Sequence, residues 1–420
     1  MEGKLKEIPT KAADVVIIGG GPAGLAAAAE LYHKGIRNLV ILEREKQLGG
    51  ILRQCIHDGF GLTRFQTALS GPEYAQRFID AIEELHIPYI TDTTVLEVTR
   101  DRLVTAASRE GMMQWKAKAV ILTMGCRERT RGAIGIPGER PAGVFTAGAA
   151  QAYMNLFNTM PAREAVILGS GDIGMIMARR LTLEGAHVKA VFEIQPYPSG
   201  LPRNIEQCLN DYGIPLYLSH GITAIHGNTR LTGVTASQVD ENFMPIPGTE
   251  KEYQCDTLIL SVGLIPENEL SLDAGVILDE RTRGACVDEY FQTRADGIFS
   301  AGNVLHVHDL VDFVSLEAES LADSVAEYIK KGSLNPAVIP VKTDCNIAYT
   351  VPQRISGTRE FILSLRVKKP MKDCRIVVRQ AGKEVAVKKM KKAIPAEMIR
   401  FGISHEKLVS GSELEVCVEC

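Results

Sequence analysis

The stretch from Asp14 to Glu43 reads DVVIIGGGPAGLAAAAELYHKGIRNLVILE and predicts a strand, a glycine-rich turn, a helix and a second strand. Its apolar run, Val15 to Ile18, is typical of a strand buried on both faces. Three glycines follow in G-x-G-x-x-G spacing: Gly19, Gly21 and Gly24. The first permits a tight turn, the second lets a pyrophosphate approach the backbone, and the third lets helix and strand pack closely. Glu43 lies nineteen residues after the third glycine, where an acid accepts hydrogen bonds from a ribose. The stretch therefore predicts a dinucleotide site.

The same pattern returns 150 residues later. The segment Glu164 to Leu168 predicts a strand, and Gly169, Gly171 and Gly174 repeat the spacing. Glu193 again follows the third glycine by nineteen residues and ends the next predicted strand. Because two copies with identical spacing are hard to attribute to chance, the sequence predicts two bound dinucleotides.

Composition narrows the class of protein. The chain has 420 residues, 45% of them hydrophobic, and a net charge of −4, which gives no reason to expect nucleic acid. No apolar run approaches about 20 residues, so no membrane span is predicted. The N-terminus is polar and lacks the apolar core of a secretory signal. Nine scattered cysteines form no disulfide framework and suit a reducing compartment, so we expect a cytoplasmic protein.

The last eighty residues differ from the rest. Residues 341–420 carry 16 Lys and Arg against 9 Asp and Glu, whereas the first 340 carry 31 against 42. The βα rhythm ends near Asn335, and short strands separated by turn signals are predicted after it: Phe361 to Val367, Arg375 to Arg379, Glu384 to Lys388 and Leu414 to Val418. We therefore expect a small antiparallel β domain at the C-terminal end.

With these motifs in order, residues 12 to 335 resemble the FAD-dependent pyridine nucleotide–disulfide oxidoreductase superfamily, most closely its thioredoxin-reductase-like branch. Besides the two glycine motifs, the resemblance rests on Gly49-Gly50, the strand end Leu122-Thr123-Met124-Gly125, Ser261 to Pro266, and Gly302-Asn303. It implies that FAD contacts Gly19, Gly21, Pro22, Ala23, Gly24, Glu43, Arg44, Gly49, Gly50, Val95, Thr123, Gly125, Gly302 and Asn303. It implies that NAD(H) contacts Gly169, Gly171, Asp172, Ile173, Gly174, Glu193 and Gly263.

The resemblance also implies an α/β fold with two Rossmann-like domains, the NAD domain being inserted into the FAD domain. The expected limits are 12–158 for the first part of the FAD domain, 159–284 for the NAD domain, 285–334 for the rest of the FAD domain and 335–420 for the C-terminal β domain. Ala147 to Asn155 is expected to be a helix of the FAD domain.

Two residues affect what the cofactor sites are expected to bind. Asn303 stands where the superfamily usually has Asp, although an amide can still bond a ribitol hydroxyl. Glu193 would accept from a free 2′-hydroxyl and repel a 2′-phosphate, so NADH is favoured over NADPH. Lys189 and Arg179 lie close enough in sequence to weaken that preference.

The paired cysteines of the dithiol reductases in this superfamily are missing. Residues 171–185 contain no cysteine, and residues 51–61 supply only Cys55. Cys55 could act as a single redox thiol with help from His57, provided that it is exposed and has a lowered pKa. A buried, incidental cysteine is the alternative, and packing also explains Cys126. His306 and His308 flank the Gly-Asn turn, and the polarity of a helix start explains them as well as catalysis does. The chemistry then belongs to the flavin.

The segment CRERTRGAIGIPGERPAGVFTAGAAQAYMN, residues 126–155, is similar to one subunit of multi-subunit amino-acid, opine and sarcosine dehydrogenases, dye-linked proline dehydrogenase and hydrogen cyanide synthase. It also resembles the oxidoreductase that accompanies anaerobic glycerol-3-phosphate dehydrogenase. The resemblance implies an NAD(H)-linked electron-transfer subunit with a partner flavoprotein dehydrogenase, and a homo-oligomer is also open. A stand-alone NADH oxidase or peroxidase is the alternative function.

The chain ends in VCVEC, which places Cys417 and Cys420 in C-x-x-C spacing. Three readings stay open: a mobile dithiol, a zinc or iron–sulfur site completed by Cys345 and Cys374, or a final strand with two incidental thiols. On an extended strand the two side chains point to opposite faces, which argues against a preformed site. The cluster Lys388-Lys389-Met390-Lys391-Lys392 is either a solvated face or a docking site for an acidic partner.

Overall fold

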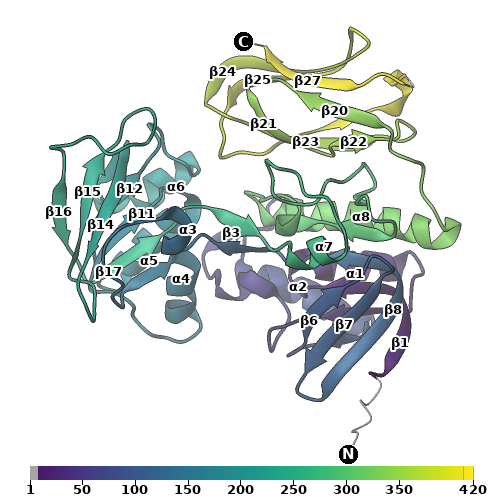
Figure 1. Cartoon of the computed structure of the whole chain (residues 1–420), viewed down its shortest axis with the longest axis horizontal. Coiled ribbons are helices and arrows are strands. Elements are labelled where there is room, and N and C mark those ends of the chain that lie inside the picture. Colours follow the sequence, from purple (N-terminus) through teal and green to yellow (C-terminus); the bar gives the residue numbers. More distant parts are fainter. Residues whose placement is uncertain (1–7, 410, 420) are drawn as a thin grey trace, which may run out of the picture. The chain divides into compact units, whose positions relative to one another are not determined.

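The computed structural model describes residues 8–409 and 411–419. It divides the chain into two compact units, residues 1–126 together with 266–420, and residues 127–265 (Figure 1). The chain passes between them at β9 (Cys126–Glu128) and β18 (Leu264–Pro266), which pair with each other. Within the described ranges, no helix has both the length and the apolar character needed to cross a bilayer.

The first unit is built on a seven-stranded sheet whose order is β5-β2-β1-β8-β7-β6, with β19 beside β8. Its strands are β1 (Thr10–Ile18), β2 (Leu39–Leu42), β5 (Tyr89–Ile90), β6 (Thr94–Val98), β7 (Leu103–Ser108), β8 (Gly111–Leu122) and β19 (Ile298–Ser300). β1 runs parallel to β2 and β8, and β19 runs parallel to β8. Val15 and Ile17 face one core while Val16 and Ile18 face another, so the sheet is covered on both sides. This confirms the strand predicted from the apolar run.

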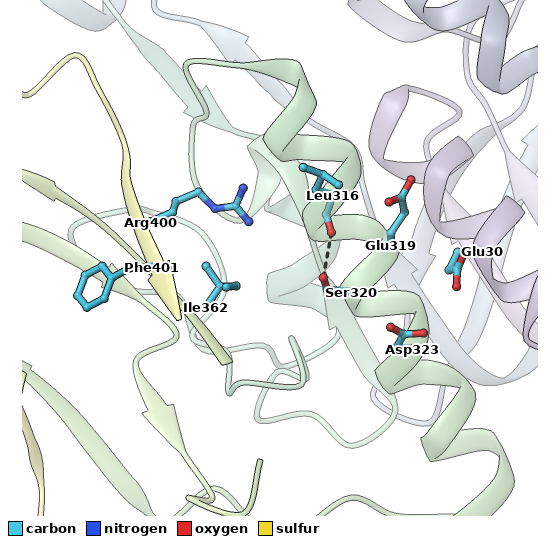
Figure 2. A pocket seen from close by; sticks show the side chains of 8 residues that line it. All are labelled: Glu30, Leu316, Glu319, Ser320, Asp323, Ile362, Arg400 and Phe401. Carbon is cyan, nitrogen blue, oxygen red and sulfur yellow. Dashed lines mark hydrogen bonds between the residues drawn. The ribbon is translucent and has the colours of Figure 1, made fainter. Parts of the chain in front are cut away.

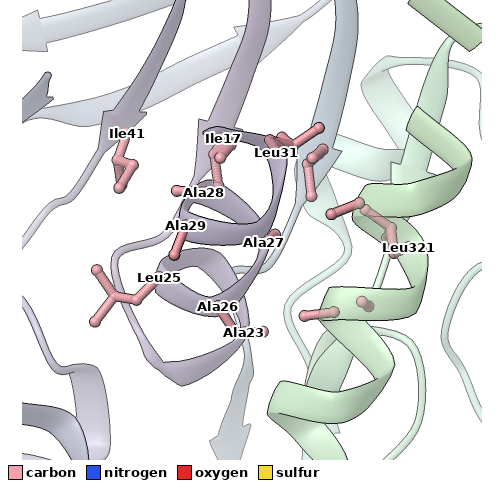
Figure 3. Close-up of a cluster of buried hydrophobic side chains, with 14 of the residues drawn as sticks. Ile17, Ala23, Leu25, Ala26, Ala27, Ala28, Ala29, Leu31, Ile41 and Leu321 are labelled. Atoms are coloured by element: carbon pink, nitrogen blue, oxygen red, sulfur yellow. The ribbon is translucent and has the colours of Figure 1, made fainter. Parts of the chain in front are cut away.

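Helices cover one side of that sheet. They are α1 (Pro22–His33), α2 (Gly71–Glu84) and α8 (Val311–Lys331), while the short α7 (Glu269–Asp273) and the hairpin β3 (Asp58–Phe60) and β4 (Leu69–Ser70) lie in the connections. Figure 3 shows Ala23 and Ala27 on the side of α1 that faces α8, near Leu321. Alanines let the two helices approach closely, while Leu25 and Leu31 are fully buried. Each of those leucines contributes about 1.5–3 kcal/mol relative to an exposed side chain.

The second unit contains a parallel five-stranded sheet with the order β10-β17-β11-β12-β13. Its elements are α3 (Arg131–Ile134), β10 (Val144–Thr146), α4 (Ala147–Asn155), β11 (Glu164–Leu168), α5 (Asp172–Leu183), β12 (His187–Glu193), α6 (Pro202–Cys208), β13 (Leu216–Leu218) and β17 (Thr257–Leu260). An antiparallel sheet of β14 (His220–His226), β15 (Gly233–Gln238) and β16 (Lys251–Gln254) completes it. The α/β class with two Rossmann-like regions and an added β region is therefore confirmed.

The limits of the compact units differ from the expected domain limits. β10 and α4 precede residue 159 but belong to the second unit, because β10 pairs with β17. Residues 266–284 belong to the first unit, where the Asn268 side chain donates to the carbonyls of Arg283 and Val304 at 2.9 Å. Strand pairing between distant segments sets these limits, and the sequence does not display it. The four domain ranges themselves stay a prediction.

The C-terminal strands form two sheets with a shared core. They are β20 (Ile339–Thr343), β21 (Ile347–Val351), β22 (Arg354–Ile355), β23 (Phe361–Val367), β24 (Met371–Gln380), β25 (Lys383–Ala393), β26 (Ile399–Ile403) and β27 (Leu414–Glu419). The four predicted strands are found, as β23, β24, β25 and β27. The expectation of a wholly antiparallel domain is wrong, because β20 pairs with β27 in parallel. The pairing of β20 with β27 brings the first and last strands of the domain together, and no short stretch of sequence indicates it.

Candidate dinucleotide sites

The first glycine loop is folded so tightly that two of its positions admit only glycine. Gly19 has φ +104°, and a Cβ there would lie 2.5 Å from the carbonyl oxygen of Thr123. A Cβ on Gly24 would lie 1.9 Å from the carbonyl oxygen of Gly19. Thr123 supports the loop from the end of β8, since its hydroxyl donates to the carbonyl of Ile18 at 2.8 Å. The loop therefore presses against β8, and α1 begins at Pro22 with its first N–H groups unpaired inside the helix.

Glu43 is held in place by backbone donors at the end of β2. Its Oε2 accepts from the N–H of Gly20 at 2.6 Å, and its Oε1 accepts from the N–H of Glu45 at 2.8 Å. The side chain is 5% exposed. Each carboxylate oxygen can accept more than one hydrogen bond, so capacity for ribose hydroxyls remains.

Three of the distant predicted segments come to this loop. A Cβ on Gly50 would lie 3.0 Å from the Cα of Gly21, and the N–H of Gly49 donates to Gly20 at 2.8 Å. A Cβ on Gly302 would lie 3.0 Å from the Cβ of Ala23. Segments 19–24, 49–50, 123–125 and 302–303 thus surround the start of α1.

The other residues assigned to FAD lie at the margin of this group. Val95 follows Thr93 by two residues, and the N–H of Thr93 donates to the carbonyl of Glu43 at 2.9 Å. Arg44 is exposed beside Glu45 at 3.9 Å. Glycine-lined backbone, a fixed acid and a helix start are what a pyrophosphate and a ribose require, so the residues fit FAD.

The sequence interpretation missed how the Gly302 turn is supported. Glu317 of α8 is buried, and its Oε1 accepts from the N–H of Gly302 at 2.8 Å. His306 lies 2.7 Å from Oε2 of the same carboxylate, and burial lowers the pKa of His306 to about 4. The side chains of His306 and His308 are 0% and 1% exposed, so the polarity of a helix start does not explain them. The His-x-His spacing after Asn303 was the feature of the sequence that could have indicated this buried cluster.

The second glycine loop repeats the backbone of the first. Gly169 has φ +102°, and a Cβ there would lie 2.0 Å from the carbonyl oxygen of Ser261. A Cβ on Gly174 would lie 2.6 Å from the carbonyl oxygen of Gly169. Gly171 precedes α5, whose residue Ile173 packs into the core of this unit. The carbonyl of Gly263, at the end of the neighbouring strand, accepts from the N–H of Arg129 at 3.0 Å.

Glu193 and Asp172, the acids of the second loop, accept hydrogen bonds from side chains as well as from backbone N–H groups. Oε2 of Glu193 accepts from Ser170 N at 3.0 Å, from Ser170 Oγ at 2.6 Å and from Ser199 Oγ at 2.7 Å. Oδ1 of Asp172 accepts from Leu201 N at 2.8 Å and from Asn204 Nδ2 at 2.6 Å. These bonds tie segment 199–204 to the loop, and they fit the ribose of a nicotinamide dinucleotide placed at Glu193.

Neither nearby cation is directed at Glu193. Lys189 pairs with Glu164 at 3.1 Å, and Arg179 donates to the hydroxyl of Tyr212 at 3.3 Å. The two basic side chains that weakened the expected preference for NADH therefore bind other partners.

Cys55 does not meet the conditions set for a redox thiol. Cys55 is 9% exposed, its Sγ lies 3.4 Å from the carbonyl of Ile51, and burial raises its pKa to about 12. A reactive cysteine needs exposure and a lowered pKa, so the incidental reading is favoured. His57 packs beside Phe60, with ring centroids 5.0 Å apart.

The C-terminal cysteines do not gather either. Burial raises the pKa of Cys417, whose Sγ lies 3.5 Å from a nitrogen of Arg379. Among residues 8–409 and 411–419, Cys345, Cys374 and Cys417 form no group with metal-ligand spacing. Cys420 lies outside the described residues.

A cavity of about 530 Å³ lies elsewhere in the first unit, between α8 and strands β23 and β26 (Figure 2). None of the predicted site residues lines it. Its acids already have partners, because Asp323 pairs with Lys34 at 2.7 Å and Glu319 pairs with Arg64 at 2.8 Å. Its charges therefore give no sign of a bound ligand.

Comparison with known proteins agrees with this geometry. A family model described as pyridine nucleotide-disulphide oxidoreductase matches residues 13–322. The A subunit of opine oxidase from Agrobacterium tumefaciens is 28% identical over 315 residues, which are 69% of this chain and 61% of that protein. Hydrogen cyanide synthase subunit HcnB of Pseudomonas protegens is 26% identical and covers 62% of this chain and 58% of its own length. The chain thus spans about three fifths of these curated relatives.

Two further relatives extend the comparison. The small chain of glutamate synthase [NADPH] of Mycobacterium tuberculosis is 25% identical and covers 78% of this chain and 69% of itself. The crystal structure of T. acidophilum thioredoxin reductase has a TM-score of 0.61 at 23% identity, covering 76% of this chain and 98% of that one. At that identity the structural likeness shows the fold alone.

Proposed function

The chain belongs to the pyridine nucleotide-disulphide oxidoreductase family as an FAD-dependent NAD(P)H oxidoreductase, and we propose that it is the electron-transfer subunit of a multi-subunit dehydrogenase. Bound FAD supplies the hydride-accepting chemistry. The chain binds it with the loop at Gly19 and Glu43, and binds NAD(H) with the loop at Gly169 and Glu193. In this proposal a partner flavoprotein oxidises the substrate and exchanges electrons with this chain.

One observation carries the proposal: the thiol nearest the first glycine loop in sequence, Cys55, is buried and has a raised pKa. Electrons therefore need an acceptor or donor other than a cysteine at this position. The names of two relatives support a protein partner, since the opine oxidase protein and HcnB are both called subunits. Glycerol 3-phosphate is one candidate for the partner's substrate.

The C-terminal domain offers a surface for such a partner. β25 is at the edge of its sheet and exposes Lys389, Lys391 and Lys392. Lysines on an edge strand discourage pairing with another strand, and they also attract an acidic surface. We include docking of an acidic partner here in the proposal, with a homo-oligomer as the other possible assembly.

Coenzyme and location complete the proposal. Buried Glu193, with Lys189 and Arg179 engaged elsewhere, favours NADH over NADPH. The nine scattered cysteines of the sequence form no disulfide framework, which supports a reducing, cytoplasmic location.

The deciding experiment is purification of the tagged chain from its native cell, followed by NADH turnover with candidate donors. We expect a flavoprotein dehydrogenase to co-purify in stoichiometric amount and the isolated chain to turn over slowly. A variant with Lys389, Lys391 and Lys392 changed to Gln tests the docking surface. It should keep its flavin and lose the partner.

The second candidate is a stand-alone NADH oxidase or peroxidase. A chain that purifies alone and reduces oxygen or peroxide at full rate would establish it and defeat the proposal of a multi-subunit complex. Replacing Cys55 then separates a thiol peroxidase from a reaction at bare flavin.

A further inference from the structure

Three side chains with metal-binding atoms meet directly after the Gly302-Asn303 turn. His306 and His308 precede α8, and Glu317 lies within it; their ligand atoms are all within 4.8 Å of one another. The side chains are 0%, 1% and 2% exposed. Nε2 of His306 is 2.7 Å from Oε2 of Glu317, and Nε2 of His308 is 3.4 Å from the same oxygen.

The hydrogen bonds around His308 leave one of its nitrogens without a partner. Oδ1 of Asn303 accepts from the backbone N–H of His308 at 3.0 Å and lies 3.3 Å from its Nδ1. Because a carbonyl oxygen only accepts, the ring proton is assigned to Nδ1. The lone pair of Nε2 then faces the carboxylate of Glu317, and Nε2 has no hydrogen-bond partner in the described part of the chain. Two buried acceptors facing each other cost free energy unless something positive lies between them.

The neighbouring arginines have other partners and supply no positive charge between Nε2 of His308 and the Glu317 carboxylate. Arg366 pairs with Asp309 at 3.2 Å and donates to three backbone carbonyls. Arg400 lies over the ring of Phe313, 4.5 Å from its centroid. Among the residues that the structure describes, His306 and His308 are the only basic side chains with a nitrogen within 4.0 Å of the Glu317 carboxylate.

We propose that His306, His308 and Glu317 bind a divalent metal ion, with Zn²⁺ as the preferred ion. Imidazole nitrogens and a carboxylate oxygen are zinc ligands, and ligand atoms of a tetrahedral site with bonds of about 2.1 Å lie about 3.4 Å apart. The distance from Nε2 of His308 to Oε2 of Glu317 has that value. His306 lies closer, at hydrogen-bond distance, and the metal replaces the proton between it and Glu317.

The surroundings orient two of the three ligands. Asn303 holds Nδ1–H of His308, and the N–H of Gly302 holds the second oxygen of Glu317 at 2.8 Å. Such outer partners fix the tautomer of a histidine ligand and the direction of a carboxylate. The metal would therefore join α8 to the turn proposed to meet the flavin ribitol, as a structural ion.

The test is metal content per flavin in the full-length protein, expressed with added Zn²⁺ and measured by plasma mass spectrometry. We expect about one Zn²⁺ per chain, falling below about 0.1 in His308→Gln. His187→Gln is the matched control, because His187 also lies beside a carboxylate, Glu164 at 3.0 Å, but on an exposed surface; it should keep the metal. Asn303→Ala should weaken binding by about 10- to 100-fold.

Dipicolinate should lower the melting temperature of the wild type and leave that of His308→Gln unchanged. If His308→Gln does not fold, the wild-type content and the Asn303→Ala comparison decide. Flavin-loaded wild type with less than about 0.1 metal ion per chain would overturn the proposal. Metal that persists in both His308→Gln and His306→Gln would overturn it as well.

Discussion

The two glycine loops share one backbone and differ in what surrounds them. In both, the first glycine has φ near +100° and the third packs against the carbonyl of the first. The loop at Gly19 is joined by segments 49–50, 123–125 and 302–303, which come from distant parts of the chain. The loop at Gly169 is joined by one distant strand end, at Ser261, and by the nearby polar segment 199–204. In our proposal the first loop, with its additional distant segments, holds the resident FAD, and the second loop binds the exchanging nicotinamide coenzyme.

The largest effect should come from adding a methyl group to either loop. Gly24→Ala places a Cβ 1.9 Å from a backbone oxygen, and Gly174→Ala places one at 2.6 Å. Overpacking of about 3 kcal/mol lowers occupancy more than about 100-fold. We expect Gly24→Ala to lose flavin absorbance, and Gly174→Ala to keep its flavin and lose NADH-dependent bleaching. The reverse pattern would exchange the roles of the two loops.

The first unit also contains a buried acid that should make its stability depend on pH. Asp288 is 3% exposed, and burial together with Glu289 raises its pKa from 3.8 to about 7. The folded state then binds the proton more tightly than the unfolded state, so the contribution is complete below pH 4 and is lost as the pH rises through about 7. A shift of three units corresponds to at most about 4 kcal/mol.

Asp288→Asn should therefore stabilise the protein at pH 8 by about 2 kcal/mol, less than that limit because the buried amide gains N–H groups without assured acceptors. The gain should disappear near pH 4, as measured by thermal unfolding. Asp279→Asn is the control, because Asp279 also accepts two backbone N–H bonds in a turn. An equal gain for both variants would contradict the assignment to Asp288.

The acids at the two loops should separate coenzyme choice from flavin retention. In Glu193→Gln a neutral amide replaces the carboxylate that four donors approach, three at Oε2 and the N–H of Gln195 at Oε1. Losing a charged acceptor costs about 1.5 kcal/mol, so the preference for NADH over NADPH should shrink about tenfold. Rapid-mixing measurement of flavin bleaching by each coenzyme checks this. Glu43→Gln should weaken flavin retention and leave the coenzyme ratio unchanged; equal bleaching rates in the wild type would refute the preference.

The smallest effect should come from Cys55→Ser. A hydroxyl can replace the thiol near the carbonyl of Ile51, and a thiol with a pKa of about 12 takes no part at neutral pH. NADH oxidation with any acceptor should change less than about twofold. Loss of peroxide reduction in this variant, with bound flavin retained, would instead establish the thiol peroxidase.

Local features were readable from the sequence because their cause is local. Gly19 and Gly24 mark a turn that no other residue permits, and the run from Val15 to Ile18 reports burial on both faces. The ends of α4 were predicted as found, Ala147 to Asn155. The acids Glu43 and Glu193 were located by their distance from the glycines, and both are buried at strand ends.

Tertiary structure decided what depends on distant segments. Burial raises the pKa of Cys55 and disfavours the redox role that its position suggested, and strand pairing moves β10 and α4 into the second unit. His306 and His308 read as polar residues before a helix until α8 brings Glu317 to them and β21 places Tyr349 near His306, with ring centroids 5.9 Å apart. The sequence by itself determined two dinucleotide loops, because steric limits act within a few residues. The burial of particular thiols, acids and histidines depends on packing between residues that lie hundreds of positions apart. Only the folded chain shows this packing.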